Sequence, residues 1–283
     1  MTLHDLQTPN GKFAIAPFDQ RGSLAKLLGV DHTSESGKKE IKDLKISFMK
    51  VFSPIASGVL VDPEFGLPAL EYRDHHAGLL LSLEKSSYDA EDKNAMPQFY
   101  EGWGVSQIIE KGGMVKLLMF YHPQSSNADK KRALAKKFFE ESKAAGSPFL
   151  LEVILHPNGE SEQEFIQTFT KLQTQLVKDF TDVCDVLKLE FPIHAGAELN
   201  EDEAAKACDQ ISAASKVPWI LLSKGMGFER FIRAVEIAMK HGSSGFAVGR
   251  AIWKEVGDYP TIERENFLHN VAVPRLQQLI ALL

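Results

Sequence analysis

A lysine and a glutamate lie two residues apart in a short apolar segment, Val186–Phe191, of this 283-residue sequence. Because side chains alternate between the two faces of a strand, Lys188 and Glu190 are expected to share one face. A lysine inside a protein is costly unless it is paired or neutral. When burial or a second cation lowers its pKa, the free amine can attack a ketone and form a Schiff base. The pattern also fits a structural ion pair of Lys188 with Glu190 or Glu152.

Two further charges interrupt apolar segments in the same way. Lys116 lies in the segment Met114–Leu118, and Glu152 lies in the segment Leu150–Ile154. If these segments are neighbouring strands, Lys116 and Lys188 flank Glu152 in one pocket. A carboxylate between two amines can shuttle protons, and a second lysine helps to keep the first one neutral. The pattern favours a catalytic site, with a buried structural network as the alternative.

Glycine-containing turns follow the last two apolar segments. Ser223-Lys224-Gly225-Met226-Gly227 follows Trp219–Leu222, and Gly249-Arg250 follows Gly245–Val248. Glycine lets backbone N–H groups approach a phosphate, and arginine can clamp two of its oxygens. The alternative is an ordinary turn glycine beside a surface arginine. The predicted phosphate-binding residues are Ser223, Gly225, Gly249 and Arg250.

The elements that must position these residues are eight apolar segments that alternate with helix signals. The segments are Phe13–Phe18, Gly58–Val61, Gly78–Leu83, Met114–Tyr121, Phe149–Leu155, Val183–Phe191, Trp219–Leu222 and Gly245–Val248. Nearly continuous apolar composition is typical of parallel strands covered by helices. Capping signals at Ser161-x-x-Glu164 and Asn200-x-x-Glu203 predict helix starts between them. The pattern predicts an α/β fold, a (β/α)8 TIM barrel that forms a single domain over residues 1–283.

In such barrels the active site lies at the carboxyl ends of the strands, so polar residues at those ends are candidates for the active site. Asp19, Gln20 and Arg21 end the first segment, and Asp62 ends the second. We predict Asp19 as a further catalytic residue beside Lys188, Glu152 and Lys116. The predicted substrate-binding residues are Gln20, Arg21, Asp62 and Glu190. The polar stretch Lys85–Pro97 is either a mobile loop over the barrel mouth or a plain surface loop.

Composition excludes several other classes of protein. The net charge is −6 and no basic stripe is visible, which argues against nucleic-acid binding. No apolar run approaches the roughly 20 residues of a membrane helix, and no signal peptide is recognisable. The two cysteines form no CxxC pair, so a cytoplasmic location is expected. The histidines lack HxxxH and HxH spacings, so no metal or other cofactor is expected.

Four segments together resemble the class I tagatose-1,6-bisphosphate aldolases and the related sulfofructosephosphate aldolases. They are Asp19-Gln20-Arg21-Gly22, Leu60–Ala69, Asp185–Pro192 and Val248–Trp253. The resemblance implies a (β/α)8 barrel and a metal-independent aldol cleavage. It implies that Lys188 forms the Schiff base and that Glu152 handles protons. It also implies that Asp19, Gln20 and Lys116 surround the sugar carbons, while Ser223, Gly249 and Arg250 hold a phosphate.

The expected partner is therefore a phosphorylated sugar, a ketose 1,6-bisphosphate that yields dihydroxyacetone phosphate and glyceraldehyde 3-phosphate. A sulfofructosephosphate aldolase, which would release sulfolactaldehyde, is the first alternative. A metal-dependent barrel lyase or isomerase and a non-catalytic sugar-phosphate-binding regulator are weaker ones. Barrels often associate through surface helices, so a homo-oligomer is also open.

Overall fold

Eight parallel strands close into a barrel in the computed structural model, which describes residues 2–86 and 94–283. The strands pair in chain order, and β8 closes the barrel against β1. They are β1 (Phe13–Pro17), β2 (Gly58–Val61), β3 (Gly78–Ser82), β4 (Met114–Tyr121), β5 (Phe149–Leu155), β6 (Val186–Leu189), β7 (Trp219–Leu222) and β8 (Gly245–Ala247). Helices shield the outside and the barrel encloses the inside, which is why these segments are almost uniformly apolar. The predicted (β/α)8 fold class is confirmed.

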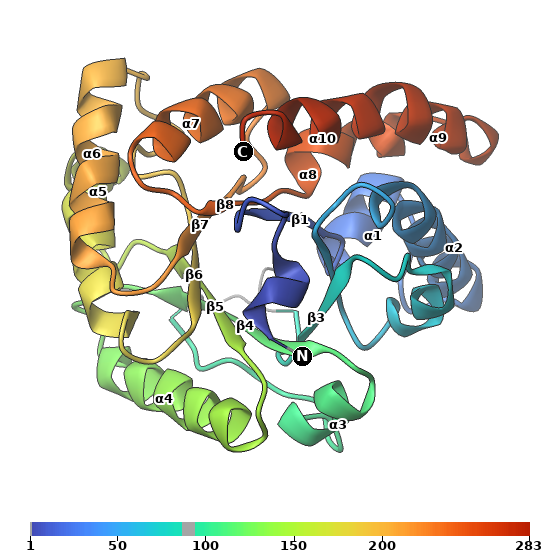
Figure 1. The fold of residues 1–283 in the computed structure, drawn as a ribbon, viewed down its shortest axis with the longest axis horizontal. Coiled ribbons are helices and arrows are strands. Elements are labelled where there is room, and N and C mark those ends of the chain that lie inside the picture. Colours follow the sequence, from blue (N-terminus) through green and yellow to red (C-terminus); the bar gives the residue numbers. More distant parts are fainter. Residues whose placement is uncertain (1, 87–93) are drawn as a thin grey trace.

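Helices follow the strands and form a ring around the barrel (Figure 1). They are α1 (Gly22–Leu28), α2 (Glu35–Phe52), α3 (Val105–Glu110), α4 (Ala128–Ala144), α5 (Glu162–Phe180), α6 (Glu201–Ala214), α7 (Phe228–Lys240), α8 (Arg250–Trp253), α9 (Thr261–Phe267) and α10 (Val273–Ile280). The chain also forms the 3₁₀ segments η1 (Leu3–Leu6), η2 (Leu67–Tyr72) and η3 (Lys254–Asp258) and the π-helical segment η4 (Leu268–Ala272). The capping box at Ser161 and Glu164 begins α5, and the side chain of Asn200 caps α6, as predicted.

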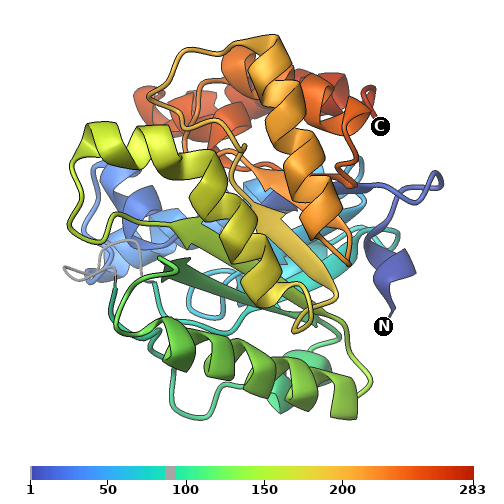
Figure 2. The same ribbon diagram turned by 90° about the vertical axis from the view of Figure 1, so that its left-hand side faces the viewer.

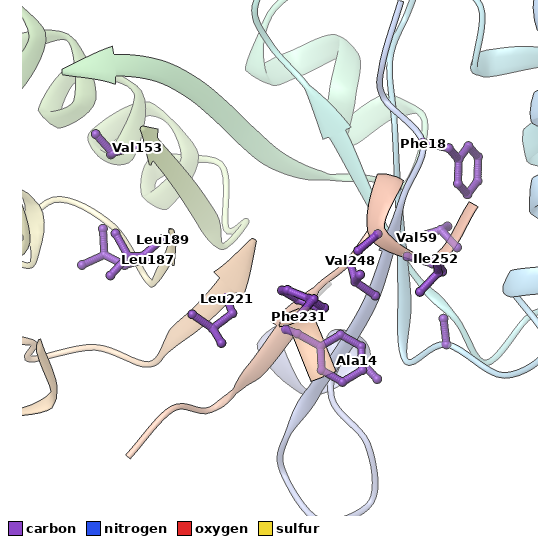
Figure 3. Packing of buried hydrophobic residues seen from close by; sticks show 14 of the residues in the cluster. Ala14, Phe18, Val59, Val153, Leu187, Leu189, Leu221, Phe231, Val248 and Ile252 are labelled. Carbon is purple, nitrogen blue, oxygen red and sulfur yellow. The ribbon is translucent and has the colours of Figure 1, made fainter. Parts of the chain in front are cut away.

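Apolar side chains pack on both faces of the strands. The outer layer joins the strands to the helices, and Figure 3 shows part of it, including Val59, Leu221 and Phe231. The inner layer forms a floor near the amino ends of the strands, where Leu6 of η1 joins it and closes the barrel. The floor residues are Leu6, Phe13, Ile15, Leu60, Leu80, Met114, Leu150, Val186, Ile220 and Ala247. Figure 2 shows both chain termini at this end of the barrel.

The sixth strand is shorter at its start than the sequence predicts. It begins at Val186 instead of Val183, because the chain still turns out of α5, with Val183 N–H bonded to the Phe180 carbonyl. Asp185 then pairs with Phe149 through its backbone N–H and accepts the Phe149 N–H on its carboxylate at 2.8 Å. The apolar run therefore predicted too long a strand, since the first residues of the run form a turn.

The polar stretch Lys85–Pro97 is described only at its ends. Lys85 N–H bonds to the Gln98 carbonyl at 2.7 Å, and Glu84 forms a bridge with Phe99. Residues 87–93, on which the prediction of a loop over the barrel mouth depends, lie outside the described residues. Within residues 2–86 and 94–283, no helix has both the length and the apolar character needed to span a membrane.

Candidate active site

Three charged side chains lie in the barrel directly above the apolar floor. Lys116, Glu152 and Lys188 each follow a floor residue by two positions, so strand alternation points them into the barrel. Glu152 and Lys188 are register partners of the β5–β6 ladder. The Nζ atom of Lys188 lies 2.9 Å from Glu152 Oε2, and the Nζ atom of Lys116 lies 3.0 Å from the same oxygen. The predicted arrangement of two amines around one carboxylate is therefore present.

Glu84 completes this cluster, although the sequence patterns did not single it out. It follows Leu80 and Ser82 in the inward-facing series of β3, and its side chain is 1% exposed. Its Oε1 atom accepts a hydrogen bond from Lys116 Nζ at 2.8 Å, and its Oε2 atom accepts the Leu118 N–H at 3.0 Å. Continued alternation beyond the strand end is the signal that could have found it.

Lys116 lies among three carboxylates, because Asp19 Oδ2 also accepts its hydrogen bond, at 2.9 Å. Burial lowers the pKa of Lys116, but Asp19, Glu152 and Glu84 together raise that pKa well above its ordinary value. Burial raises the pKa of Asp19, yet the charges of Lys116 and Lys188 bring it well below its usual range. Burial is the largest influence on the pKa of Glu84 and raises it. Lys116 is thus a fixed cation and Asp19 a fixed anion at neutral pH.

Gln20 and Arg21 line a small cavity at the mouth together with these carboxylates. Gln20 Nε2 donates to Asp19 Oδ1 at 3.3 Å, while its Oε1 is buried with no hydrogen-bond partner in the described part of the chain. An unpaired buried acceptor of this kind suits a substrate hydroxyl. Arg21 is more constrained, because its Nη1 atom donates to the Glu84 carbonyl at 3.0 Å and to the Tyr100 hydroxyl at 2.9 Å. Those two bonds tie Arg21 to the base of the loop after β3.

Asp62 is fully buried and forms an ion pair with Lys45 of α2. Its Oδ1 atom accepts the N–H groups of Glu64 and Phe65 at 3.0 and 2.8 Å, and Lys45 Nζ also donates to the Phe18 carbonyl at 2.9 Å. Burial lowers the pKa of Lys45. Both oxygens of Asp62 are taken up by protein groups, so this geometry gives the residue a structural role in place of the predicted substrate contact.

The turns after β7 and β8 meet at the barrel mouth. Gly225 has a φ of +80°, and a methyl group there would lie 3.8 Å from Arg250 Nη1. A methyl group on Gly249 would lie 2.8 Å from the Pro17 carbonyl oxygen, so only glycine fits so close to β1. Ser223 is buried at the end of β7. The structure therefore brings the four predicted phosphate-binding residues to one side of the mouth.

Glu190 lies two residues beyond Lys188 but pairs elsewhere. Its Oε2 atom accepts the Leu155 N–H at 2.9 Å, and its Oε1 atom lies 2.6 Å from Lys224 Nζ. Burial raises the pKa of Glu190, although Lys224 opposes that effect. Of the two ion pairs that the sequence leaves open for Lys188, the described contacts form the one with Glu152.

Other reactive side chains lie in structural settings. Within the described ranges, no group of three or more His, Cys, Asp or Glu side chains could hold a metal ion. His122 contacts Glu160 at 3.2 Å, and the His194 ring packs edge-on against Phe169. Burial raises the pKa of Cys184, which keeps its thiol protonated.

The mouth of the barrel therefore combines four chemical functions. Lys188 supplies an amine, and Glu152 supplies a carboxylate 2.9 Å away that can take its proton. Lys116 supplies a positive charge that stays in place throughout. The turns beside them offer backbone N–H groups and Arg250 to an anion. Such a set suits attack on a carbonyl group in a molecule that carries a phosphate.

Comparison with known proteins points the same way. The family model described as DeoC/LacD family aldolase matches residues 13–255. Tagatose 1,6-diphosphate aldolase 2 of Streptococcus mutans is 33% identical over 274 residues, covering 89% of this chain and 82% of that protein. Tagatose 1,6-diphosphate aldolase 1 of Enterococcus faecalis is 31% identical over 281 residues, with 93% and 86% covered.

Solved structures share the architecture at lower identity. A Schiff-base-forming fructose-1,6-bisphosphate aldolase has a TM-score of 0.66 at 17% identity, covering 98% of this chain and 96% of its own. The fructose-bisphosphate aldolase of Plasmodium falciparum has a TM-score of 0.75 at 12% identity, with 99% and 92% covered. At these identities the likeness concerns the barrel fold alone.

Proposed function

Since the chain belongs to the DeoC/LacD family of aldolases, we propose that it is a metal-independent, Schiff-base enzyme that cleaves a ketose 1,6-bisphosphate of the tagatose type. The products are dihydroxyacetone phosphate and glyceraldehyde 3-phosphate. The observation that carries this proposal is the contact of the Lys188 amine with a carboxylate that it shares with Lys116. A structural ion pair needs one cation for one carboxylate, whereas here two buried amines meet at a single oxygen.

The first half of the reaction forms the iminium. Glu152 takes a proton from the Lys188 ammonium across the 2.9 Å contact, which leaves a neutral amine to attack C2 of the sugar. Glu152 then returns the proton to the C2 hydroxyl of the carbinolamine, which leaves as water. Lys116 keeps its own proton, because its pKa is well above the ordinary value, and it stabilises the Glu152 carboxylate between these transfers.

The second half breaks the C3–C4 bond. A base removes the C4 hydroxyl proton, and the electrons of the C3–C4 bond move into the iminium. The aldehyde then departs, and an enamine remains on Lys188. The lowered pKa of Asp19 makes that residue a poor base and a good acceptor for a hydroxyl, so we assign the proton transfer to Glu152. Protonation of the enamine at C3 and hydrolysis of the iminium release dihydroxyacetone phosphate and regenerate Lys188.

The substrate is held by groups on either side of this centre. The C1 phosphate lies at Ser223, Gly225, Gly249 and Arg250, where glycine exposes backbone donors and the guanidinium supplies charge. The unpaired Oε1 atom of Gln20 accepts a sugar hydroxyl beside Asp19.

Borohydride trapping tests the mechanism. The protein is incubated with dihydroxyacetone phosphate, reduced, digested and mapped by mass spectrometry. We expect one adduct, on Lys188; an adduct on another lysine, or none, would overturn the proposal. Cleavage of the sugar bisphosphate is expected to proceed at its full rate in EDTA, and loss of activity there would point to a metal-dependent lyase.

A side-by-side cleavage assay tests the substrate. It compares tagatose 1,6-bisphosphate, fructose 1,6-bisphosphate and 6-deoxy-6-sulfofructose 1-phosphate at equal enzyme concentration. We expect the highest kcat/KM for tagatose 1,6-bisphosphate. Faster cleavage of the sulfosugar would instead assign the chain to the sulfofructosephosphate aldolases, and binding without any turnover would indicate a regulator.

A further inference from the structure

Lys224 has a backbone conformation that lysine rarely adopts. Its φ is +46°, and it is the one non-glycine residue with a positive φ in the part of the chain that the structure describes. Side chains other than glycine are disfavoured there, so the fold has to hold the residue in place. Lys224 stands between Ser223 and Gly225, in the turn that we assign to the C1 phosphate.

The side chain of Lys224 is held by a buried carboxylate. Its Nζ atom lies 2.6 Å from Glu190 Oε1, and Glu190 is 7% exposed while Lys224 is 32% exposed. Glu190 does not depend on Lys224 alone, because its other oxygen accepts the Leu155 N–H. The lysine is thus the partner that can leave, since it is on the solvent side and has a long, flexible stem.

The position of this ammonium relative to Lys188 fits a phosphate on the adjacent carbon. Glu190 follows Lys188 by two residues, which places its Cα roughly 7 Å further toward the mouth. A C1 phosphate on a sugar bound through C2 to Lys188 can reach the layer of Glu190 within the length of the C1–O–P linkage. A doubly charged phosphate there would compete with the single charge of Glu190 for the Lys224 ammonium.

We propose that Lys224 is an additional residue that binds the phosphate of the substrate, and that Glu190 pairs with it while no substrate is bound. In the free enzyme Lys224 pairs with Glu190, and on binding it turns from the carboxylate to the phosphate. The raised pKa of Glu190 supports this exchange, because a carboxylate that accepts a proton readily releases its lysine at low cost. The inference rests on the proposed function for the place of the phosphate, and it adds a competition between Glu190 and the substrate.

Such a competition predicts opposite effects for the two partners. Lys224→Gly removes the ammonium and relieves the strained backbone, so the variant is expected to fold while its affinity for phosphate falls by about tenfold or more. Glu190→Gln frees the ammonium and keeps an acceptor for Leu155, so phosphate affinity is expected to rise by a few-fold. Lys216→Ala, which removes an exposed lysine before β7, is the matched control and is expected to change nothing.

Calorimetric titration with inorganic phosphate measures the phosphate affinity of the wild-type chain and of the three variants. Circular dichroism checks that each variant is folded. Weaker binding in Lys224→Gly with tighter binding in Glu190→Gln supports the exchange. Unchanged affinity in Lys224→Gly overturns it, whatever happens to Glu190→Gln, and so does weaker binding in both variants. If borohydride trapping fails while phosphate binding still responds in this pattern, the proposed function falls and the anion site stands.

Discussion

Two regions of this barrel bury a lysine against a carboxylate, and they differ in what else lies nearby. Behind β2, Lys45 and Asp62 are both fully buried, and their other hydrogen bonds to described residues involve backbone groups. Inside the barrel, Lys188 shares the Glu152 oxygen with Lys116, which also contacts Asp19 and Glu84. The first pair is closed, with one cation for one anion. The second is a network that opens onto a cavity.

Burial and pairing therefore do not identify a catalytic lysine. Lys45 satisfies both conditions as fully as Lys116 does, and burial lowers its pKa as a reactive amine would require. What distinguishes the second region is the direction in which its side chains point and the number of charged groups that share contacts. Its side chains point into the barrel at the carboxyl ends of the strands, and two amines contact the same oxygen of Glu152. The comparison predicts that one region controls activity and the other stability.

The largest expected effect is on the activity side, in Lys188→Ala. Removing the amine prevents the Schiff base, so kcat should fall on the order of 10⁴- to 10⁶-fold, as for loss of other covalent nucleophiles. The free energy of unfolding should change little, because Glu152 keeps Lys116 as a partner. Steady-state cleavage assays and urea unfolding measure the two effects. Retention of more than a few per cent of kcat would remove Lys188 from the mechanism.

The next effect is on the stability side, in Lys45→Met. It leaves the Asp62 carboxylate buried without its cation, which is expected to lower the free energy of unfolding by about 3–5 kcal/mol. The kcat of the folded protein should stay close to that of the wild type. The double variant Lys45→Met/Asp62→Leu should recover much of the lost stability, because no charge is then left unpaired. A variant that unfolds normally but has lost kcat would show that this pair belongs to the active site.

Glu84→Gln tests whether the second region extends beyond the residues that the sequence predicts. Glutamine can still accept the Leu118 N–H but no longer neutralises Lys116, so kcat is expected to fall roughly 10- to 100-fold with KM little changed. Glu140→Gln, on the exposed surface of α4, is the matched control. Equal kcat in both variants would place Glu84 outside the catalytic network.

The same variant has a pH signature. The pKa of Glu84 is raised in the folded protein, so its contribution to stability is fully present below the unfolded pKa of about 4.3 and is lost as the pH rises through the folded value. The wild type should therefore lose stability relative to Glu84→Gln as the pH rises from about 4 toward neutrality. Urea unfolding at several pH values follows this difference, and an opposite slope would mean that Lys116 dominates the pKa of Glu84.

The fold was predictable because each strand is buried on both faces, which leaves a continuous apolar run in the sequence. The same signal misled at Val183–Asp185, since an apolar run does not distinguish a strand from the turn that leads into it. It also gave no sign that η2, a 3₁₀ turn, replaces a full helix between β2 and β3. Strand alternation placed Lys188 and Glu152 correctly, because both lie within strands where the period of two holds.

Residues beyond the strand ends were harder to predict, because alternation no longer fixes the direction of a side chain. Glu84 continues the inward series of β3, but its sequence neighbours suggest the start of a polar loop. Asp62 turns instead toward Lys45, a residue 17 positions earlier on α2 that shares a helix face with Ile41 and Phe48. That lysine on an apolar face was a visible sign of a buried partner. Only the three-dimensional arrangement shows which carboxylate it meets.

Lys39→Ala, six residues before Lys45 on the same helix, is expected to have the smallest effect. Lys39 Nζ lies 2.6 Å from Asp43 Oδ2, a contact as short as many buried ones, but the two side chains are 78% and 56% exposed. Water screens the attraction, and ordering two long side chains costs entropy, so the free energy of unfolding should change by less than about 0.5 kcal/mol. Urea unfolding of this variant beside Lys45→Met compares an exposed and a buried pair within one helix. A loss as large as that of Lys45→Met would mean that helix contacts, and not burial of the charge, account for the stability of the first region.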